Sequence, residues 1–215
     1  MKVVSNPEIS REVLQRLRDK YLTPKPLPHV TELIYCLTRS YWDRLDPIEP
    51  TDHELLLFAV GFGLEEMLLR QEGQEPPKAI ELDGITLTPD YIALRGGMVD
   101  LKSTRAYPDK VTREPGKGWS ETWQEQFMAY AKAFGKLEYT VTVVYIIPAE
   151  VASFTFVFTE AELGANWQKM LQRKAQYMEA LEAGKVPTPF TTNREWECRF
   201  CRYLGRCNSL VGKEA

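Results

Sequence analysis

Hydrophobic residues near the start of the chain recur at the spacing of one helix face. They do so from residue 31 to 44 and again from 51 to 70, which predicts two helices. Thr51 and Glu54 stand three positions apart at the start of the second segment, which is the spacing of a capping box. We therefore expect this second helix to begin close to Thr51.

The hydrophobic pattern changes to alternation in the middle of the chain. Residues 79–102 predict short strands with turns at Asp83-Gly84 and Gly96-Gly97, and together these favour a meander. The elements expected after a loop are a helix over 120–134, strands over 139–147 and 153–158, a helix over 159–184 and a cysteine-bearing tail over 186–215. This order of elements indicates a mixed α/β protein.

Length and composition narrow the class of protein. With 215 residues and 44% hydrophobic residues, the chain can bury a core as one domain over 1–215. The expected parts are a helical part over 29–70, a core over 79–185 and a tail over 186–215. The net charge of -3 excludes a protein that coats nucleic acid through overall basicity. Because the chain has no membrane-length apolar run and no secretory apolar core, we expect a cytoplasmic protein without a membrane partner.

Two acidic residues and a lysine form the strongest chemical signal. Asp100 and Lys102 are two apart in an expected strand, so their side chains share a face while Leu101 points back into the core. A neighbouring strand that ends at Asp90 could bring a second carboxylate beside them. Paired carboxylates suit Mg²⁺ or Mn²⁺, which polarise phosphates and activate water, while an ammonium stabilises developing negative charge. The pattern favours phosphodiester hydrolysis; a solvated strand end is the alternative.

Two helices carry further polar residues that fit such a site. Glu65 and Glu66 flank the apolar stripe of the helix over 51–70, where a carboxylate is costly unless it is paired or binds a metal. Either is a candidate third metal ligand; the alternative is a glutamate that reaches solvent. Gln126 and Tyr130 are four apart on the next helix and so share one face. Beside the acidic strand this pair looks functional, although ordinary packing would also explain it.

Taken together, these residues resemble the PD-(D/E)xK nuclease superfamily, and specifically its RecB-like branch. The matching text, in the family's order, is Gly61-x3-Glu65, Pro89-Asp90, Asp100-Leu101-Lys102 and Gln126-x3-Tyr130. The branch usually has histidine where Glu65 stands, which leaves open the metal preference and the choice between Glu65 and Glu66. The resemblance covers about residues 29–207 and implies an α/β, restriction-endonuclease-like core with a mixed central sheet flanked by helices.

The resemblance also implies a role for each matched residue. The implied ligands of Mg²⁺ or Mn²⁺ are Glu65, Asp90, Asp100 and the carbonyl of Leu101. The implied catalytic residues are Asp90, Asp100, Lys102, Gln126 and Tyr130. Among these, Lys102 would assist the attacking water, and the Gln126 and Tyr130 pair would lie near the scissile strand and position the substrate or the lysine.

Four cysteines form a second pattern. Cys198, Cys201 and Cys207 make a compact triplet with metal-binding spacing, and Cys36 can supply the fourth thiolate if the first helix packs beside the tail. In a reducing compartment such cysteines favour metal binding or the core over disulfides. The RecB-like CRISPR-associated exonucleases have one early and three late cysteines around a 4Fe-4S cluster, and the resemblance implies the same here. Zinc and unliganded cysteines are the alternatives, because spacing alone does not separate them.

Residues around the cysteines add two expectations. The aromatic residues expected to shield the cluster from solvent are Trp196, Phe200 and Tyr203. The arginines expected to give its surface a positive face toward the DNA backbone are Arg194, Arg199, Arg202 and Arg206. Because a cluster that joins positions 36 and 207 closes most of the chain into a loop, we expect an architectural role rather than electron transfer.

The expected function is that of a Mg²⁺- or Mn²⁺-dependent DNA exonuclease that acts on single-stranded ends. The resemblance to the CRISPR-associated exonucleases implies trimming of DNA before spacer integration, with the CRISPR integrase complex as partner. A stand-alone phage or recombination nuclease would have the same chemistry and different partners. A non-catalytic DNA-binding scaffold that keeps the fold is a further alternative, for which the departure at Glu65 is the only hint.

Overall fold

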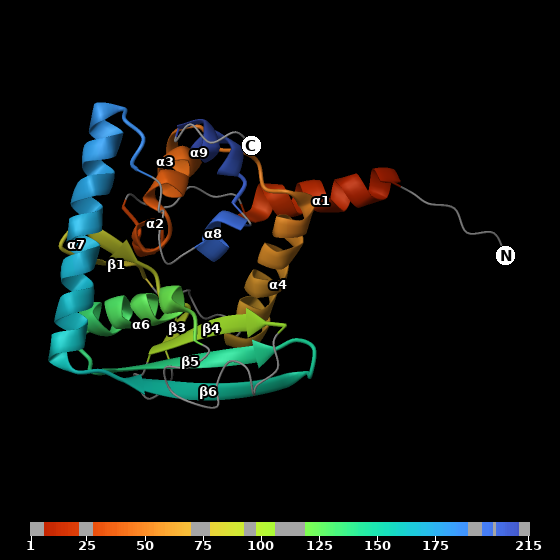
Figure 1. Ribbon diagram of the computed structural model, residues 1–215. Coiled ribbons are helices and arrows are strands. Elements are labelled where there is room, and N and C mark those ends of the chain that lie inside the picture. The colour runs from red at the N-terminus through yellow and green to blue at the C-terminus, as the bar shows by residue number, and fades with distance from the viewer. Residues whose placement is uncertain are drawn as a thin grey trace.

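The computed structural model shows a mixed four-stranded sheet flanked by helices (Figure 1). The residues that it describes are 7–21, 28–69, 78–92, 98–105, 119–188, 195–199 and 201–210. The strands are β3 (Tyr91–Ile92), β4 (Met98–Thr104), β5 (Glu138–Tyr145) and β6 (Glu150–Val157), hydrogen-bonded in that order. β4 and β5 run parallel and the outer pairs run antiparallel, so the expected mixed sheet is confirmed.

The register of β4 and β5 shows which face of the sheet carries Asp100 and Lys102. Asp100 pairs with Val141 and Lys102 pairs with Val143, so these four side chains lie on one face of the sheet. Val141 and Val143 are fully buried in the core. The alternation along β4 is as expected, but the core-facing set is the one that contains Asp100 and Lys102, and Leu101 points to the other face.

One helix covers the core face of the sheet, and a second helix packs against the first. They are α6 (Glu121–Ala133), which lies over β5, and α7 (Glu160–Ala183), which packs across α6 (Figure 1). The N-terminus of α7 is a capping box formed by Thr159 and Glu162, and its C-terminus is Gly184 at φ 61°. Both ends of this helix agree with the prediction from the sequence.

The predicted helix over 31–44 is broken at Cys36. The remaining helices are α1 (Pro7–Tyr21), α2 (Val30–Ile34), α3 (Leu37–Leu45), α4 (Asp52–Leu69), α8 (Glu195–Arg199) and α9 (Leu204–Leu210). Tyr35 and Cys36 take non-helical backbone angles between α2 and α3. The Arg173 guanidinium on α7 donates to the carbonyls of Leu33 and Tyr35. Those carbonyls therefore bond to a side chain 138 or more positions away, which the local pattern did not indicate.

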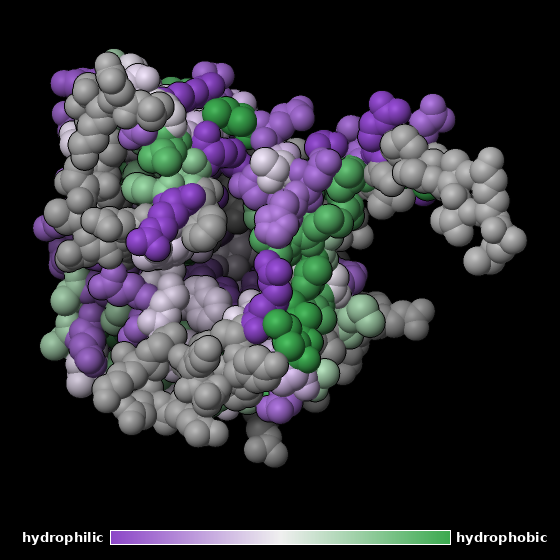
Figure 2. Space-filling view, turned by 45° about the vertical axis from the view of Figure 1, so that its right-hand side comes forward, coloured by the Kyte–Doolittle hydropathy of each residue, from purple (hydrophilic) through white to green (hydrophobic). Residues whose placement is uncertain are grey.

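α4 keeps an uncovered apolar surface. This helix packs against α1 and β4. Leu56, Val60 and Met67 are nevertheless 51%, 42% and 81% exposed, and Figure 2 shows an apolar band along the helix. No helix in the described part of the chain is long and apolar enough to cross a membrane.

The predicted meander is divided between two sheets. The strands β1 (Ile80–Leu82) and β2 (Ile85–Leu87) form a separate antiparallel hairpin. Asp83 and Gly84 close it with φ values of 49° and 67°, so this predicted turn is confirmed. The predicted turn at Gly96-Gly97 lies outside the described residues.

Candidate active site and cysteine site

Asp100 and Lys102 form a buried ion pair on the core face of β4. The side chain of Asp100 is 1% exposed and that of Lys102 is 17% exposed, and the Lys102 ammonium contacts Oδ2 of Asp100. Oδ1 of Asp100 is buried and has no hydrogen-bond partner in the described part of the chain. A buried carboxylate oxygen without a donor is costly, so the ion pair alone does not satisfy this carboxylate.

The protonation of the pair follows from burial and from a second carboxylate. Burial raises the pKa of Asp100 to about 7; Lys102 lowers it and Asp90 raises it. Burial on its own lowers the pKa of Lys102, but Asp100 and Asp90 outweigh that effect and hold it above its ordinary value. Lys102 therefore keeps its proton at neutral pH, while burial and Asp90 together disfavour the ionised form of Asp100.

Asp90 reaches Asp100 through the pairing of β3 with β4. Tyr91 pairs with Val99, which brings the residue that precedes β3 to the level of the acidic strand. Oδ2 of Asp90 accepts a hydrogen bond from the backbone N–H of Leu101 at 2.8 Å. This bond fixes the second carboxylate close enough to Asp100 to raise its pKa.

Gln126 and Tyr130 face each other on α6, directly beside this pair. Tyr130 is 1% exposed, and its hydroxyl donates to the backbone carbonyl of Thr88 at 2.7 Å. The side chain of Gln126 lies close enough to the Tyr130 hydroxyl to oppose the rise in its pKa that burial causes. Because Thr88 lies two positions before Asp90, the bond from Tyr130 holds the segment that carries this carboxylate.

Glu65 and Glu66 have different surroundings on α4. Glu65 is half-buried and Glu66 is exposed, on a helix that packs against β4. Across the described residues, no three His, Cys, Asp or Glu side chains are arranged to hold a metal ion. The structure thus brings Asp90 and Asp100 together without placing Glu65 in a ligand set with them.

The acidic pair nevertheless has the donor chemistry of a divalent-cation site. Asp90 and Asp100 provide carboxylate oxygens, the ligands that Mg²⁺ and Mn²⁺ prefer. Oδ1 of Asp100 is buried without a donor, so no protein hydrogen bond would have to break for it to bind a cation. The charge of such an ion would also offset the repulsion between the two carboxylates.

The four cysteines are neighbours in the fold. All four are half-buried and none forms a disulfide. Burial raises the pKa of Cys207 to about 11, and the nearby thiols of Cys36, Cys201 and Cys198 act in the same direction. The early cysteine therefore does meet the late triplet, although no three of these thiols adopt a metal-holding arrangement in the described ranges.

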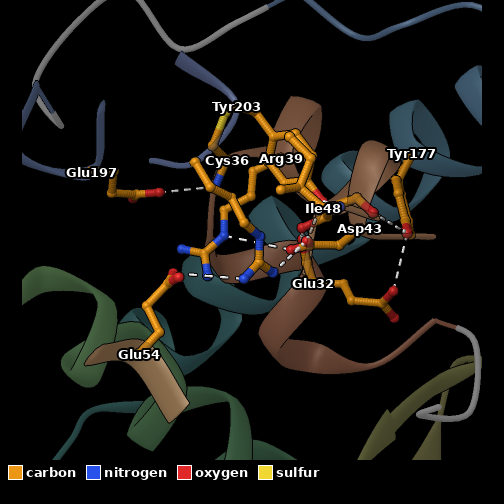
Figure 3. A network of polar contacts seen from close by, with 11 residues as sticks. Glu32, Cys36, Arg39, Asp43, Ile48, Glu54, Tyr177, Glu197 and Tyr203 are labelled. Carbon is orange, nitrogen blue, oxygen red and sulfur yellow. Dashed lines mark hydrogen bonds and ion pairs between the residues drawn. The ribbon is translucent and has the colours of Figure 1, made fainter. Parts of the chain in front are cut away.

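Glu197 joins the tail to the segment that carries Cys36. Its carboxylate accepts a hydrogen bond from the backbone N–H of Cys36 at 3.0 Å (Figure 3). Glu197 is only 7% exposed and directly precedes Cys198 on α8. This bond, between residues 161 positions apart, sets the first cysteine of the tail beside Cys36.

Asp43 on α3 is the centre of the contacts that dock the end of the tail (Figure 3). Its Oδ1 accepts hydrogen bonds from Arg202 at 2.6 Å and from the hydroxyl of Tyr203 at 2.7 Å. The backbone N–H of Ile48 donates to the same tyrosine oxygen at 3.0 Å. Arg202 also forms an ion pair with Glu54 at 3.6 Å, which ties the tail to the first turn of α4.

The expected positive face around the cysteines is only partly present. Arg202 is 16% exposed and pairs with an aspartate of α3, and Arg206 pairs with the aspartate at the end of that helix at 2.9 Å. The charge of Arg202 is therefore paired within the protein, whereas the pair of Arg206 lies at the surface. Arg199 is exposed, and Arg194 lies outside the described residues.

The expected aromatic shield also differs from the prediction. Tyr203 is fully buried and stacks on Trp42 with the ring centroids 5.5 Å apart. Trp196 is 46% exposed, so about half of its surface is covered by the protein. Phe200 lies outside the described residues.

Two residues beside these sites carry little or no signal in the sequence. Tyr139 on β5 lies behind the acidic pair, but in the sequence it is one aromatic residue within an apolar strand and gives no signal. Glu197 offered a weak signal, because it is an acidic residue directly before the first cysteine of a metal-binding triplet.

Comparisons with known proteins identify the family of this chain. The family model of the PD-(D/E)XK nuclease superfamily matches residues 5–208. A structure described as the crystal structure of SSO0001 is similar at 17% identity and a TM-score of 0.55, covering 94% of this chain and 96% of that chain. An alkaline exonuclease (LHK-Exo) from Laribacter hongkongensis gives 12% identity and a TM-score of 0.47, covering 72% and 89%. A search of curated proteins found no match. Because the family model spans nearly all of the sequence, the chain belongs to the PD-(D/E)XK nuclease superfamily.

Proposed function

We propose that this nuclease is a Mg²⁺- or Mn²⁺-dependent DNA exonuclease, folded as one domain, that hydrolyses phosphodiesters at single-stranded ends. The observation that carries the proposal is the buried group of Asp90, Asp100 and Lys102, in which a carboxylate oxygen has no donor. Burying a carboxylate oxygen without a donor costs free energy in the protein alone. Such an oxygen is expected where a cation and a phosphate complete the site.

The carboxylates and the lysine of this site would have different roles in the reaction. A divalent ion, when bound, would polarise the scissile phosphate and lower the pKa of water. Asp90 and Asp100 would hold that ion, with Glu65 and the carbonyl of Leu101 as further ligands. Lys102 keeps its proton because two carboxylates face it, so its ammonium would orient the attacking water and stabilise charge that develops on the phosphate.

Tyr130 and Gln126 would act mainly through position. The hydroxyl of Tyr130 donates to the backbone carbonyl of Thr88, two positions before Asp90, and Gln126 lies beside that hydroxyl. Together they would keep the Asp90 carboxylate at a fixed distance from Asp100. Gln126 is half-buried and so keeps part of its surface for contact with the DNA strand.

The four cysteines are part of the same proposal. We propose that they bind a 4Fe-4S cluster with an architectural role, because one early and three late thiols meet where the tail docks on α3. Four thiolates also suit zinc, and the metal content of the protein would separate the two.

The pathway that we infer is trimming of DNA before CRISPR spacer integration, with the integrase complex as partner. This inference rests on the resemblance of the motifs and cysteines to the CRISPR-associated exonucleases. A stand-alone phage or recombination nuclease would share the chemistry, and association with an integrase would separate the two roles.

The proposal is tested by separating the role of Lys102 from that of the metal-binding carboxylates. Lys102→Ala should bind Mn²⁺ and single-stranded DNA almost normally, yet cut on the order of 10²-fold more slowly, because one donor to the transition state is lost. Asp100→Ala should lose Mn²⁺ binding together with cleavage. The measurements are a calorimetric Mn²⁺ titration and a timed digestion of labelled single-stranded DNA at fixed salt.

Lys136→Ala is the matched control for this experiment. Lys136 is exposed and lies before β5, so its loss removes a lysine without touching the acidic pair. This variant should cut at the parent rate. If Lys102→Ala also cuts at the parent rate, Lys102 is not part of the reaction and the proposed site is wrong.

A further inference from the structure

Tyr139 has a buried hydroxyl that has no role in the proposed mechanism. Its side chain is 1% exposed, and the hydroxyl has no hydrogen-bond partner in the described part of the chain. The ring is held firmly, stacked on Phe127 with centroids 5.5 Å apart and on Tyr130 with centroids 5.6 Å apart. A tyrosine needed only for packing would serve equally well as phenylalanine, because a buried hydroxyl without a partner is costly.

The position of Tyr139 places this hydroxyl beside the acidic pair. Tyr139 is two residues before Val141, the partner of Asp100 on the neighbouring strand, so Tyr139 and Asp100 point to the same face of the sheet. Burial raises the pKa of the phenol, and the charge of Asp100 raises it further, which agrees with their closeness. Tyr130, which stacks on the same ring, donates a hydrogen bond from its own hydroxyl to the carbonyl of Thr88.

The hydroxyl and the carboxylate complement each other. Tyr139 has a buried O–H donor without an acceptor, and Asp100 has a buried Oδ1 acceptor without a donor. We propose that Tyr139 is a positioning residue for the catalytic cation: its hydroxyl donates to a water that in turn donates to Oδ1 of Asp100. This link restrains the carboxylate in the orientation that binds the ion. The inference rests on the proposed function, because it assigns Tyr139 to the same cation site.

The test compares two tyrosine variants in the full chain with its cysteine site intact. Tyr139→Phe keeps the stacked ring and removes only the hydroxyl. We expect it to weaken Mn²⁺ binding by about 10- to 100-fold, the range for losing a residue that orients a metal ligand. Its melting temperature without metal should equal or exceed that of the parent, because the lost hydroxyl had no protein partner.

Tyr177→Phe is the control, since Tyr177 is a fully buried tyrosine whose hydroxyl does have partners. It donates to Glu32 at 3.0 Å and to the carbonyl of Ser40 at 3.2 Å (Figure 3). This variant should melt at a lower temperature than the parent and bind Mn²⁺ unchanged. The two variants are thus expected to show opposite patterns of stability and metal affinity.

Kinetics add a readout that packing alone would not change. Tyr139→Phe should lose kcat at low Mn²⁺, regain it when Mn²⁺ is raised about 100-fold, and keep the parent KM for DNA. Parent Mn²⁺ affinity in Tyr139→Phe, or an equal loss of affinity in Tyr177→Phe, would overturn the inference. Asp100→Asn separates this failure from that of the proposed function: if Asp100→Asn binds Mn²⁺ as the parent does, the cation site itself is wrong.

Discussion

The acidic pair and the cysteine site are built in opposite ways. Asp90 directly precedes β3 and Asp100 lies on the paired strand β4, and the backbone N–H of Leu101 donates to Asp90. The cysteines come from the two ends of the described chain and meet through the bond from Cys36 to Glu197. The first site is therefore local in sequence, whereas the second depends on long-range docking.

The two regions also differ in which polar atoms lack a hydrogen-bond partner. At the acidic pair, these atoms include a buried carboxylate oxygen and the hydroxyl of Tyr139, within the described residues. At the tail, Asp43 accepts two hydrogen bonds and Tyr203 both donates and accepts one, while the guanidinium nitrogens of Arg202 that lack a hydrogen bond belong to a group in ion pairs with Asp43 and Glu54. The atom left over at the acidic pair is thus an oxygen that can bind a cation, whereas the tail holds a cation that the protein itself pairs.

Tyr35 connects the two regions. It directly precedes Cys36, and it lies near enough to Lys102 to raise the pKa of that lysine. The guanidinium of Arg39 lies 5.6 Å from the centre of the Tyr35 ring. A displacement of the Cys36 segment would therefore move Tyr35, a neighbour of Lys102 in the candidate active site, although the two sites share no ligand.

The largest effect that separates the regions is expected from Cys201→Ala. The parent should contain about four irons per chain with visible charge-transfer absorbance, and the variant should lose both. Loss of a cross-link that closes a long loop typically removes roughly 2–5 kcal/mol, so melting about 10 °C lower is expected for a domain of this size. Mn²⁺ binding at Asp100 should survive below the melting temperature.

The control for Cys201→Ala is Ser209→Ala, which changes α9 without touching a thiol. Ser209 is exposed and its hydroxyl donates only within that helix, so the iron content and melting temperature should stay at the parent values. Full stability of Cys201→Ala after loss of the cluster would show that the protein contacts alone dock the tail. Colourless parent protein with stoichiometric zinc would replace the iron-sulfur assignment.

A smaller effect is expected from pH at the acidic pair. The pKa of Asp100 in the metal-free fold is raised to about 7, so between its ordinary value of 3.8 and that pH the folded protein holds a proton that the unfolded chain has released. The metal-free fold therefore loses stability as the pH rises across this range, and the loss is complete above about 7. Because Mn²⁺ must displace this proton, its affinity should fall about tenfold per pH unit below that value.

Calorimetric Mn²⁺ titrations on either side of neutrality would check this dependence. The melting temperature gained on adding Mn²⁺ should grow as the pH rises toward about 7 and then level off. Constant affinity across that range would mean that Asp100 is already ionised in the metal-free protein. The stability that the cysteine site contributes should not follow the same curve.

The features predictable from the sequence were those fixed by local spacing. The capping box at Thr51 and the turn at Asp83-Gly84 follow from the chemistry of a few adjacent residues, and both are present. The pairing that sets Asp90 beside Asp100 was also expected, but the strand was predicted to end at Asp90 and instead begins after it. These elements need no information from distant parts of the chain.

The features that the sequence did not reveal depend on tertiary contacts. The break at Cys36 is stabilised by Arg173 on α7, which local periodicity cannot detect. The face of β4 that carries Asp100 became the core face because the parallel register sets it beside Val141. Arg202 was expected to face DNA, but Asp43 and Glu54 lie within reach once the tail docks.

Cleavage of end-labelled single-stranded DNA by the parent and by Asp100→Asn tests the central claim most directly. Asparagine keeps the shape of the side chain and removes the charge that would bind the ion. The parent with Mn²⁺ should release nucleotides from linear DNA and leave circular single-stranded DNA intact, whereas Asp100→Asn or added chelator should reduce the rate by on the order of 10³-fold or more. Cleavage by Asp100→Asn at the parent rate would contradict the assignment of the active site, and equal cutting of circles would contradict exonuclease action.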